Sequence, residues 1–227
     1  MKNCDCEGCE LKSLFFENLR KEELDSVCDI KKEKSYQKGE IIFKEGDAIN
    51  DFYYTKNGLV KLFKADANNR EQIIYFAGPL DFISLLSIFS TERFIYSVVA
   101  LEETTVCSIE INILKSFVMH NGKFGLTIIE KINKASDKII GSMLEIRKRR
   151  LPGKIAFILL YFSEIIYKTN IFELPISRKE IAEFVGITTE NVIRTLSEFR
   201  NDGIIKIAGK TIEITEIEKL KRISLYG

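Results

Sequence analysis

Residues Ser177–Arg194 read SRKEIAEFVGITTENVIR, and this stretch decides the fold of the C-terminal part of the 227-residue chain. Ser177 followed three residues later by Glu180 forms a capping box, which predicts that a helix begins there. Gly186 supplies the positive φ that a tight turn needs after a helix. Thr188 can then cap a second helix. The stretch therefore predicts two helices joined by a glycine turn.

The second helix has an apolar face formed by Val192, Leu196 and Phe199, and a polar face on the opposite side. On the polar face, an arginine can donate two parallel hydrogen bonds to guanine, and a carboxylate can accept one from cytosine N4. Glu190 and Arg194 have this chemistry, and because they lie four residues apart they share a face and can pair with each other before or while reading adjacent bases. The pattern predicts a helix-turn-helix that reads DNA, with a helical hairpin without DNA contact as the alternative.

The segment after the two helices completes this prediction. Asp202–Lys206 and Gly209–Ile214 read as a two-stranded wing, with Lys210 at the turn, where a cation can meet a phosphate. The predicted DNA-binding residues are Ser177, Arg178, Lys179, Thr188, Thr189, Glu190, Asn191, Arg194 and Lys210.

Working outward from this motif, residues 29–110 read as short strands separated by turn signals such as Glu45-Gly46-Asp47 and Gly78-Pro79. Many short strands at regular spacing predict a barrel or jelly roll. The apolar period becomes helical from about residue 111 to residue 150. Leu151-Pro152-Gly153 then interrupts the helix and is interpreted as the linker to the C-terminal domain.

The expected fold is α+β, in four parts. These are a cysteine-bearing tail with short helices (1–28), a β-roll (29–123), a long dimerisation helix (124–150) and a winged helix-turn-helix domain (151–227).

The long helix carries an apolar seam with alternating steps of four and three residues. This heptad spacing predicts that its partner is a second copy of the same helix. An amphipathic helix lying on its own barrel is the alternative, and Ser136 and Met143 define a competing register. The predicted dimer seam comprises Ile128, Ile132, Ala135, Ile139 and Ile146, together with Ser142.

Composition limits the class of protein. The net charge is +1, so nucleic-acid binding must come from a local patch. No apolar run is long enough to span a bilayer, and MKNCDCEGCE does not begin a secretory signal. We therefore expect a cytoplasmic protein without a membrane partner. The sequence shows no nucleophile–base pair, phosphate loop or paired carboxylates, so we do not expect an enzyme.

The cysteines are the other unusual feature. Cys4, Cys6 and Cys9 crowd the first nine residues, and Cys107 stands far from them at the end of a strand-like run. Three closely spaced thiols cannot form a disulfide framework. They could ligate an iron–sulfur cluster or zinc, carry thiol redox chemistry, or belong to an inert tail. Cys28 is expected to be a small buried side chain rather than a ligand.

The chain resembles the CRP/FNR superfamily of bacterial transcription regulators over nearly its whole length. The stretches that carry the resemblance are KGEIIFKEGD (38–47), NGLVKL (57–62), the helix-turn-helix and GKTI (209–212). The resemblance implies a cyclic-nucleotide-binding-type β-roll and a homodimer that binds palindromic double-stranded DNA. It also implies contact with RNA polymerase if the protein is an activator. Glu190 and Arg194 match the residues that read the G·C-containing core of each half-site, whereas Ile193 replaces a base-reading serine of FNR-like members.

The resemblance also bears on the signal that is sensed. Ser84 and Leu85 stand where cyclic-AMP-binding members have glycine and glutamate, so no cyclic AMP is expected. The FNR branch holds an oxygen-labile [4Fe–4S] cluster with three N-terminal cysteines and one from the roll, and Cys107 matches the latter. Cys6 and Cys9 have the spacing of one N-terminal pair, whereas Cys4 departs from the family pattern. The implied ligands are Cys4, Cys6, Cys9 and Cys107.

An alternative to the iron–sulfur cluster remains open for the signal that is sensed. The same DNA-binding regulator could respond to a small apolar effector in the roll, or to zinc or thiol chemistry, without a cluster. The apolar effector pocket is expected to be lined by Phe76, Phe82, Leu85 and Phe94.

Overall fold

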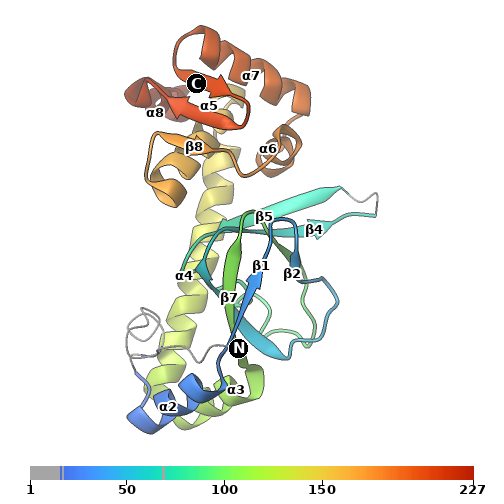
Figure 1. Ribbon diagram of the computed structural model, residues 1–227, viewed down its shortest axis with the longest axis vertical. Coiled ribbons are helices and arrows are strands. Elements are labelled where there is room, and N and C mark those ends of the chain that lie inside the picture. Colours follow the sequence, from blue (N-terminus) through green and yellow to red (C-terminus); the bar gives the residue numbers. More distant parts are fainter. Residues whose placement is uncertain (1–15, 17, 68–69) are drawn as a thin grey trace. The chain divides into compact units, whose positions relative to one another are not determined.

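The computed structural model describes residues 16, 18–67 and 70–227 (Figure 1). Cys4, Cys6 and Cys9 lie outside the described residues. The chain divides into two compact units. The first contains the chain up to Lys64 together with Ile74–Ile139, and the second contains Ala65–Ile73 together with Ile140–Gly227.

The first unit contains the β-roll, which is built from two antiparallel sheets. One has the strand order β1-β7-β3, and the other has the order β2-β6-β4-β5. Their separated, short strands confirm the jelly-roll prediction. The bounds are β1 Lys32–Tyr36, β2 Ile41–Phe43, β3 Asp51–Asn57, β4 Val60–Ala65, β5 Glu71–Ala77, β6 Ser97–Ala100 and β7 Thr104–Glu110.

Gly58 shows why the turn between β3 and β4 requires glycine. Its φ is +91°, and a Cβ placed there would lie 2.5 Å from Thr104 Oγ1 and 2.6 Å from the carbonyl oxygen of Glu103. Any side chain at this position would therefore collide with the start of β7 as well as strain the backbone.

Among the described residues, the roll is accompanied by the helices α2 (Lys21–Ile30) and α3 (Ile111–His120) and by the long α4 (Gly122–Arg147). Both α2 and α3 pack against β7. Side chains from α2, β3, β7, α3 and α4 form one buried cluster, and a second cluster fills the roll between its sheets. The β-roll and its helices thus have their own hydrophobic core.

The break after α4 lies a few residues earlier than expected. α4 ends at Arg147, and α5 (Leu151–Leu160) begins at Leu151, with proline in its first turn. Pro152 is tolerated there because the first N–H groups of a helix have no intrahelical partner. The prediction that Leu151-Pro152-Gly153 is the linker is therefore wrong, since the non-helical residues are 148–150.

The C-terminal part of the second unit is a winged helix-turn-helix. α5 continues into the π-helix η1 (Tyr161–Tyr167), and a three-stranded sheet with the order β8-β10-β9 forms the wing. In the described part of the chain, no helix is both long and apolar enough to cross a membrane. The remaining elements are β8 Ile171–Glu173, α6 Arg178–Val185, α7 Thr189–Asn201, β9 Ile205–Ala208, β10 Thr211–Ile214 and α8 Ile217–Tyr226.

Candidate DNA interface and sensor region

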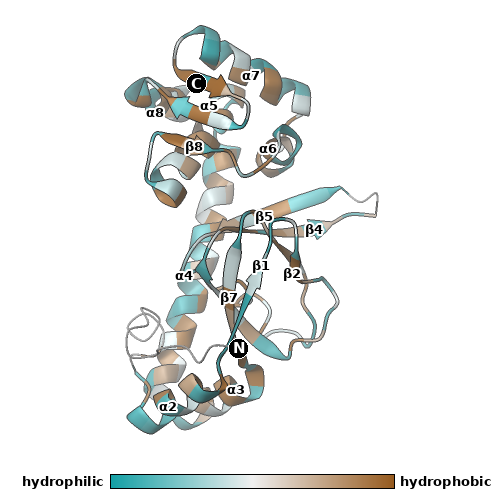
Figure 2. Ribbon diagram, in the orientation of Figure 1, coloured by the Kyte–Doolittle hydropathy of each residue, from teal (hydrophilic) through white to brown (hydrophobic). Residues whose placement is uncertain are grey.

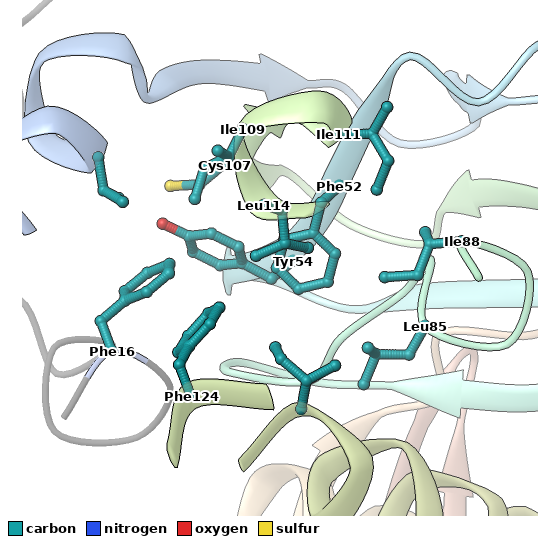
Figure 3. Packing of buried hydrophobic residues seen from close by; sticks show 12 residues of the cluster. Phe16, Phe52, Tyr54, Leu85, Ile88, Cys107, Ile109, Ile111, Leu114 and Phe124 are labelled. Carbon is teal, nitrogen blue, oxygen red and sulfur yellow. The ribbon is translucent and has the colours of Figure 1, made fainter. Parts of the chain in front are cut away.

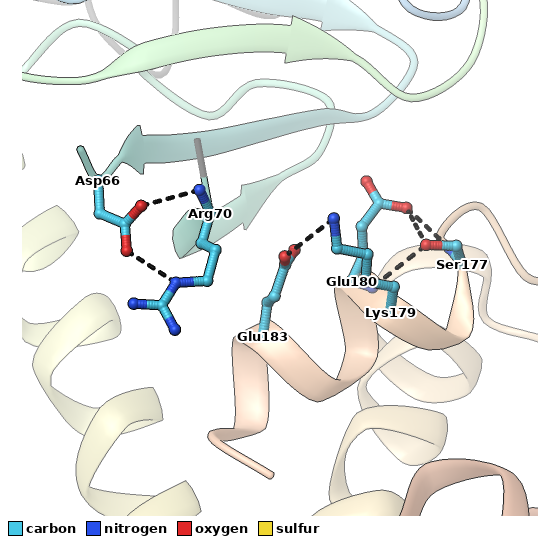
Figure 4. Close-up of polar contacts among 6 residues, drawn as sticks. All are labelled: Asp66, Arg70, Ser177, Lys179, Glu180 and Glu183. Atoms are coloured by element: carbon cyan, nitrogen blue, oxygen red, sulfur yellow. Dashed lines mark hydrogen bonds and ion pairs between the residues drawn. The ribbon is translucent and has the colours of Figure 1, made fainter. Parts of the chain in front are cut away.

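Local hydrogen bonds set the geometry of the helix-turn-helix. Ser177 Oγ accepts a bond from the Glu180 N–H at 3.2 Å, and Glu180 Oε2 accepts one from the Ser177 N–H at 2.8 Å (Figure 4). Gly186 is left-handed, with φ 69° and ψ 50°. The Thr188 hydroxyl accepts from the Asn191 N–H at 3.3 Å. The predicted capping box, glycine turn and second cap are all confirmed.

The outer face of α7 carries the predicted base-reading pair. Val192, Leu196 and Phe199 are buried as expected, whereas Glu190 and Arg194 are exposed. Hydrogen bonds from its own backbone N–H and from Thr188 lower the pKa of Glu190, so its carboxylate is charged at neutral pH.

In the structure, Arg194 has other partners than Glu190. Arg194 Nη2 donates instead to Asn191 Oδ1 at 3.1 Å, and its Nε lies 3.9 Å from Glu198 Oε1. These partners lie three and four residues away on the same helix, so they compete with Glu190 for the guanidinium.

The other predicted DNA-binding residues lie around this helix. Lys210 is exposed in the turn between β9 and β10, and Thr189 is the first residue of α7. Lys179 is exposed, and its Nζ lies 3.7 Å from Glu183 Oε1 (Figure 4). Arg178 is half-buried, and desolvation lowers its pKa. Their contacts with DNA remain predictions.

One large apolar residue exposed on α7 was not among the predicted contacts. The Ile193 side chain is 52% exposed on the helix that carries Glu190 and Arg194. It was noted in the sequence only as a departure from a family serine. The signal that could have identified it is its place one residue from Val192, outside the buried stripe.

The first half of the predicted dimer seam on α4 packs against the core of the protomer itself. Ile128 is 2% exposed and belongs to the cluster around Cys107, against which Ile132 and Ala135 also pack. Ile139 lines a cavity beside the roll, and Ile146 is 7% exposed. Ile128 and Ile146 are thus buried within one protomer and are not available to a second copy. Ile132, Ala135 and Ile139 are only partly buried, so their place in a dimer seam stays a prediction. The alternative, a helix lying on its own barrel, describes the first half of this stripe.

A second stripe on α4 points outward. Leu126, Ile129, Ile140 and Met143 are between 46% and 69% exposed, and Figure 2 shows hydrophobic and hydrophilic residues alternating along this helix. Asn133 and Ser136 complete the steps of three and four residues between them. The outward stripe has the heptad spacing of a helix–helix seam and includes the competing register through Ser136 and Met143.

Cys107 is enclosed by apolar and aromatic side chains. It is fully buried, its sulfur lies beside the Tyr54 hydroxyl, and Phe16 belongs to the same cluster (Figure 3). The Phe16 ring stacks on Phe124 with their centroids 6.4 Å apart. Desolvation raises the pKa of the Cys107 thiol to about 11, against the opposing effect of a hydrogen bond with Tyr54. Cys28, by contrast, is partly exposed, so its predicted burial is incomplete.

The segment that would contact a cyclic nucleotide has a structural role here. Ser84 Oγ accepts a hydrogen bond from the Tyr53 N–H at 2.8 Å, and Leu85 is 2% exposed in the core. Arg93 Nη1 donates to the Gly46 carbonyl oxygen at 2.7 Å. Residues 84 and 85 therefore offer no carboxylate to a ribose, and the nearby guanidinium already has a backbone partner.

A cavity of about 310 Å³ opens between the roll and α4. Its roll side is mainly apolar, whereas α4 contributes three lysines, and Lys138 Nζ lies 3.0 Å from Asp81 Oδ1. The predicted apolar lining is wrong in most members, because Phe76, Leu85 and Phe94 are core residues and only Phe82 lines the cavity. Its charged residues are Asp81, Lys131, Lys134 and Lys138.

A winged helix-turn-helix linked by a long helix to a β-roll defines a class of protein, the DNA-binding transcription regulators with a sensor domain. Residues 33–121 match the cyclic nucleotide-binding domain model, and residues 153–223 match the Crp-like helix-turn-helix domain model. The chain belongs to the CRP/FNR family of transcription regulators.

Several relatives align over nearly the whole chain. The transcriptional activator protein FnrA of Stutzerimonas stutzeri is 27% identical over 95% of this chain and 90% of its own. The anaerobic regulatory protein of Haemophilus influenzae is 27% identical over 98% of this chain and 88% of its own. The structure of FixK2 from Bradyrhizobium japonicum has a TM-score of 0.76 at 23% identity and covers 86% of this chain and 97% of its own. These similarities support the regulator class and the fold.

Proposed function

We propose that this protein is a homodimeric regulator that binds palindromic DNA through α7 and pairs through the outward stripe of α4. The exposed heptad carries the dimer proposal, because four large apolar side chains on one helix face are otherwise left in water. A two-fold dimer presents two copies of α7 to two half-sites. Contact with RNA polymerase follows if the protein acts as an activator.

The test of the dimer compares two charge substitutions on neighbouring faces. Ile140→Glu places a carboxylate in the outward stripe and is expected to yield a folded monomer by analytical ultracentrifugation. Asp137→Lys, at an exposed position of the same helix outside the stripe, should remain dimeric. A dimer that tolerates Ile140→Glu would overturn this interface.

We further propose that the dimer responds to oxygen or redox state through a [4Fe–4S] cluster held by Cys4, Cys6, Cys9 and Cys107. Relatives named anaerobic regulatory protein and FnrA support this signal. A cluster, when bound, would supply oxygen-sensitive redox chemistry, and four thiolates are a suitable ligand set.

The position of Cys107 fits this ligand set. Phe16 packs in the same cluster as Cys107, and Cys9 precedes Phe16 by seven residues. A chain of that length can extend over roughly 23 Å, so the N-terminal thiols are within reach of Cys107. The protein's own contribution is to exclude water, because the Cys107 side is covered by aromatic and aliphatic groups.

The cluster proposal is tested by anaerobic purification. The protein should be brown, contain about four iron atoms per chain for a cubane cluster, and bleach in air. Cys107→Ser should lose the iron while retaining the fold, and Cys28→Ser is the matched control. Iron-free protein, or iron that persists in Cys107→Ser, would contradict the proposal.

The cavity supports a second candidate signal, a small amphipathic anion. Its apolar side suits a hydrocarbon or aromatic body. Its three lysines still outnumber the carboxylates that pair with them, since Lys138 pairs with Asp81 and Lys134 with Glu130. The fluorescent anion 1-anilinonaphthalene-8-sulfonate is a suitable probe. The fluorescence of this probe should rise when the parent protein is added. The rise should be smaller with a Lys134→Gln, Lys138→Gln double variant. Lys123→Gln, on α4 but outside the cavity, is the control, and equal fluorescence in all three would exclude this site.

A further inference from the structure

The recognition helix α7 exposes one large aliphatic side chain, that of Ile193. Its other apolar side chains, Val192, Leu196 and Phe199, are buried against the rest of the domain. Isoleucine forms helices less readily than alanine, lysine or arginine, and an aliphatic group left in water gains nothing from burial. Within the described chain, neither helix propensity nor packing favours isoleucine at this position.

The neighbours of Ile193 are polar groups suited to base edges. Glu190 precedes it by three residues and Arg194 follows it directly, and both are exposed. Ser197, one turn later, donates its hydroxyl to the Ile193 carbonyl at 2.9 Å, so this hydroxyl is turned back onto the helix. When α7 lies in a major groove, Ile193 thus presents an aliphatic group to the base edges beside the charged groups of Glu190 and Arg194.

We propose that Ile193 packs on the C5 methyl group of a thymine in each half-site and thereby specifies thymine beside the pair read by Glu190 and Arg194. The thymine methyl is the apolar group of the major-groove edge. Isoleucine has no donor or acceptor in its side chain. Placed over the amino group of cytosine or adenine, it would leave that donor without a partner, which disfavours those bases. This inference rests on the proposed two-fold reading of a palindrome.

The test removes only the methyl group. Two randomised duplex libraries are prepared with dTTP or with dUTP, and each is selected with the full-length protein. From the first library, the parent protein should enrich sequences with thymine at one fixed position of each half-site. From the second library, uracil should not be preferred at that position. For the selected duplex, replacing these thymines by uracil should weaken binding roughly fourfold per half-site and roughly fifteenfold for both.

Variants assign the methyl effect to one side chain. Ile193→Ser should bind the thymine and uracil duplexes equally, and Ile193→Val should retain part of the difference. Ile165→Ser, which alters an exposed isoleucine in η1, should behave as the parent. A parent protein that is indifferent to uracil, or a uracil penalty that persists in Ile193→Ser, would overturn the thymine contact alone. A library that returns no motif would overturn the sequence-specific reading by α7 together with it.

Discussion

α7 and α4 are both amphipathic helices, but α7 has one apolar stripe and α4 has two. In α7 the stripe of Val192, Leu196 and Phe199 is buried, and the outer face is polar apart from Ile193. In α4, one stripe packs with Ile128, Ile132 and Ala135 against the core around Cys107, and the other is exposed. Both follow steps of three and four residues. Heptad spacing alone therefore indicates that a helix has a packed face, without showing whether the partner is its own domain or a second copy.

The largest expected effect separates the two stripes of α4. Ile128→Ala should lower the free energy of unfolding by about 2–5 kcal/mol, because it leaves a cavity in the core around Cys107. The neighbouring Ile129→Ala removes an exposed side chain and should act on association instead. Urea unfolding at several protein concentrations distinguishes them, since only the second effect should vary with concentration. If both variants lost the same free energy of unfolding at every protein concentration, the two stripes of α4 would not differ in their role, and the distinction between a core face and an association face would be contradicted.

The next effect concerns the outer face of α7. Arg194→Ala should weaken binding to the selected operator by about 1–3 kcal/mol per half-site, because a bidentate contact to guanine is lost. Arg194→Lys should not restore it, since an ammonium lacks the planar fork. Arg200→Ala, an exposed arginine in the last turn of α7, is the control in fluorescence anisotropy. An Arg194→Ala protein with unchanged affinity would remove this residue from the reading face.

A smaller effect is expected at the start of α6. Ser177→Ala should destabilise the C-terminal domain by about 0.5–2 kcal/mol, because the Glu180 N–H loses its acceptor. Ser197→Ala removes a hydroxyl that bonds only within its own helix and should change stability by less than about 0.5 kcal/mol. Thermal unfolding followed by circular dichroism measures both. If Ser177→Ala did not change the thermal unfolding, the start of α6 would be held by tertiary packing and not by the Ser177 cap.

The smallest effect is expected at the cavity beside the roll. Asp81→Asn breaks the ion pair with Lys138, whose side chain is 59% exposed, so stability should fall by only about 0–1 kcal/mol and less at high salt. The same change leaves three lysines without a carboxylate in the cavity lining and should strengthen binding of the anionic probe. Weaker probe binding in Asp81→Asn would contradict the charge argument.

The helix-turn-helix was predictable because its determinants are local. Ser177, Glu180, Gly186 and Thr188 each act on a backbone group within four residues, and their geometry agrees with the sequence. The position of the α4–α5 break was less predictable, because proline both interrupts a helix and begins one.

The sensor side could not be predicted to the same depth. The cavity combines Asp81 of the roll with Lys138 of α4, which are 57 residues apart, and only tertiary packing brings them together. The outward stripe of α4 was hard to recognise in the sequence because Asn133 and Ser136 interrupt its apolar pattern, whereas the inward stripe is almost purely aliphatic. The partners of Arg194 were not predictable from spacing alone, since Asn191 and Glu198 lie on the same helix as Glu190 and compete for the same guanidinium.

The burial of Cys107 makes this thiol a reporter of local opening. A reagent can reach its sulfur only when the layer containing Phe16 and Val27 lifts from the sheet, so the labelling rate is the chemical rate multiplied by the open fraction. Cys28, which is partly exposed, provides the reference rate in the same molecule. The ratio of the two rates therefore reports the fraction of molecules in which the core around Cys107 is open, and ligands that stabilise this layer will slow the labelling of Cys107 without slowing that of Cys28.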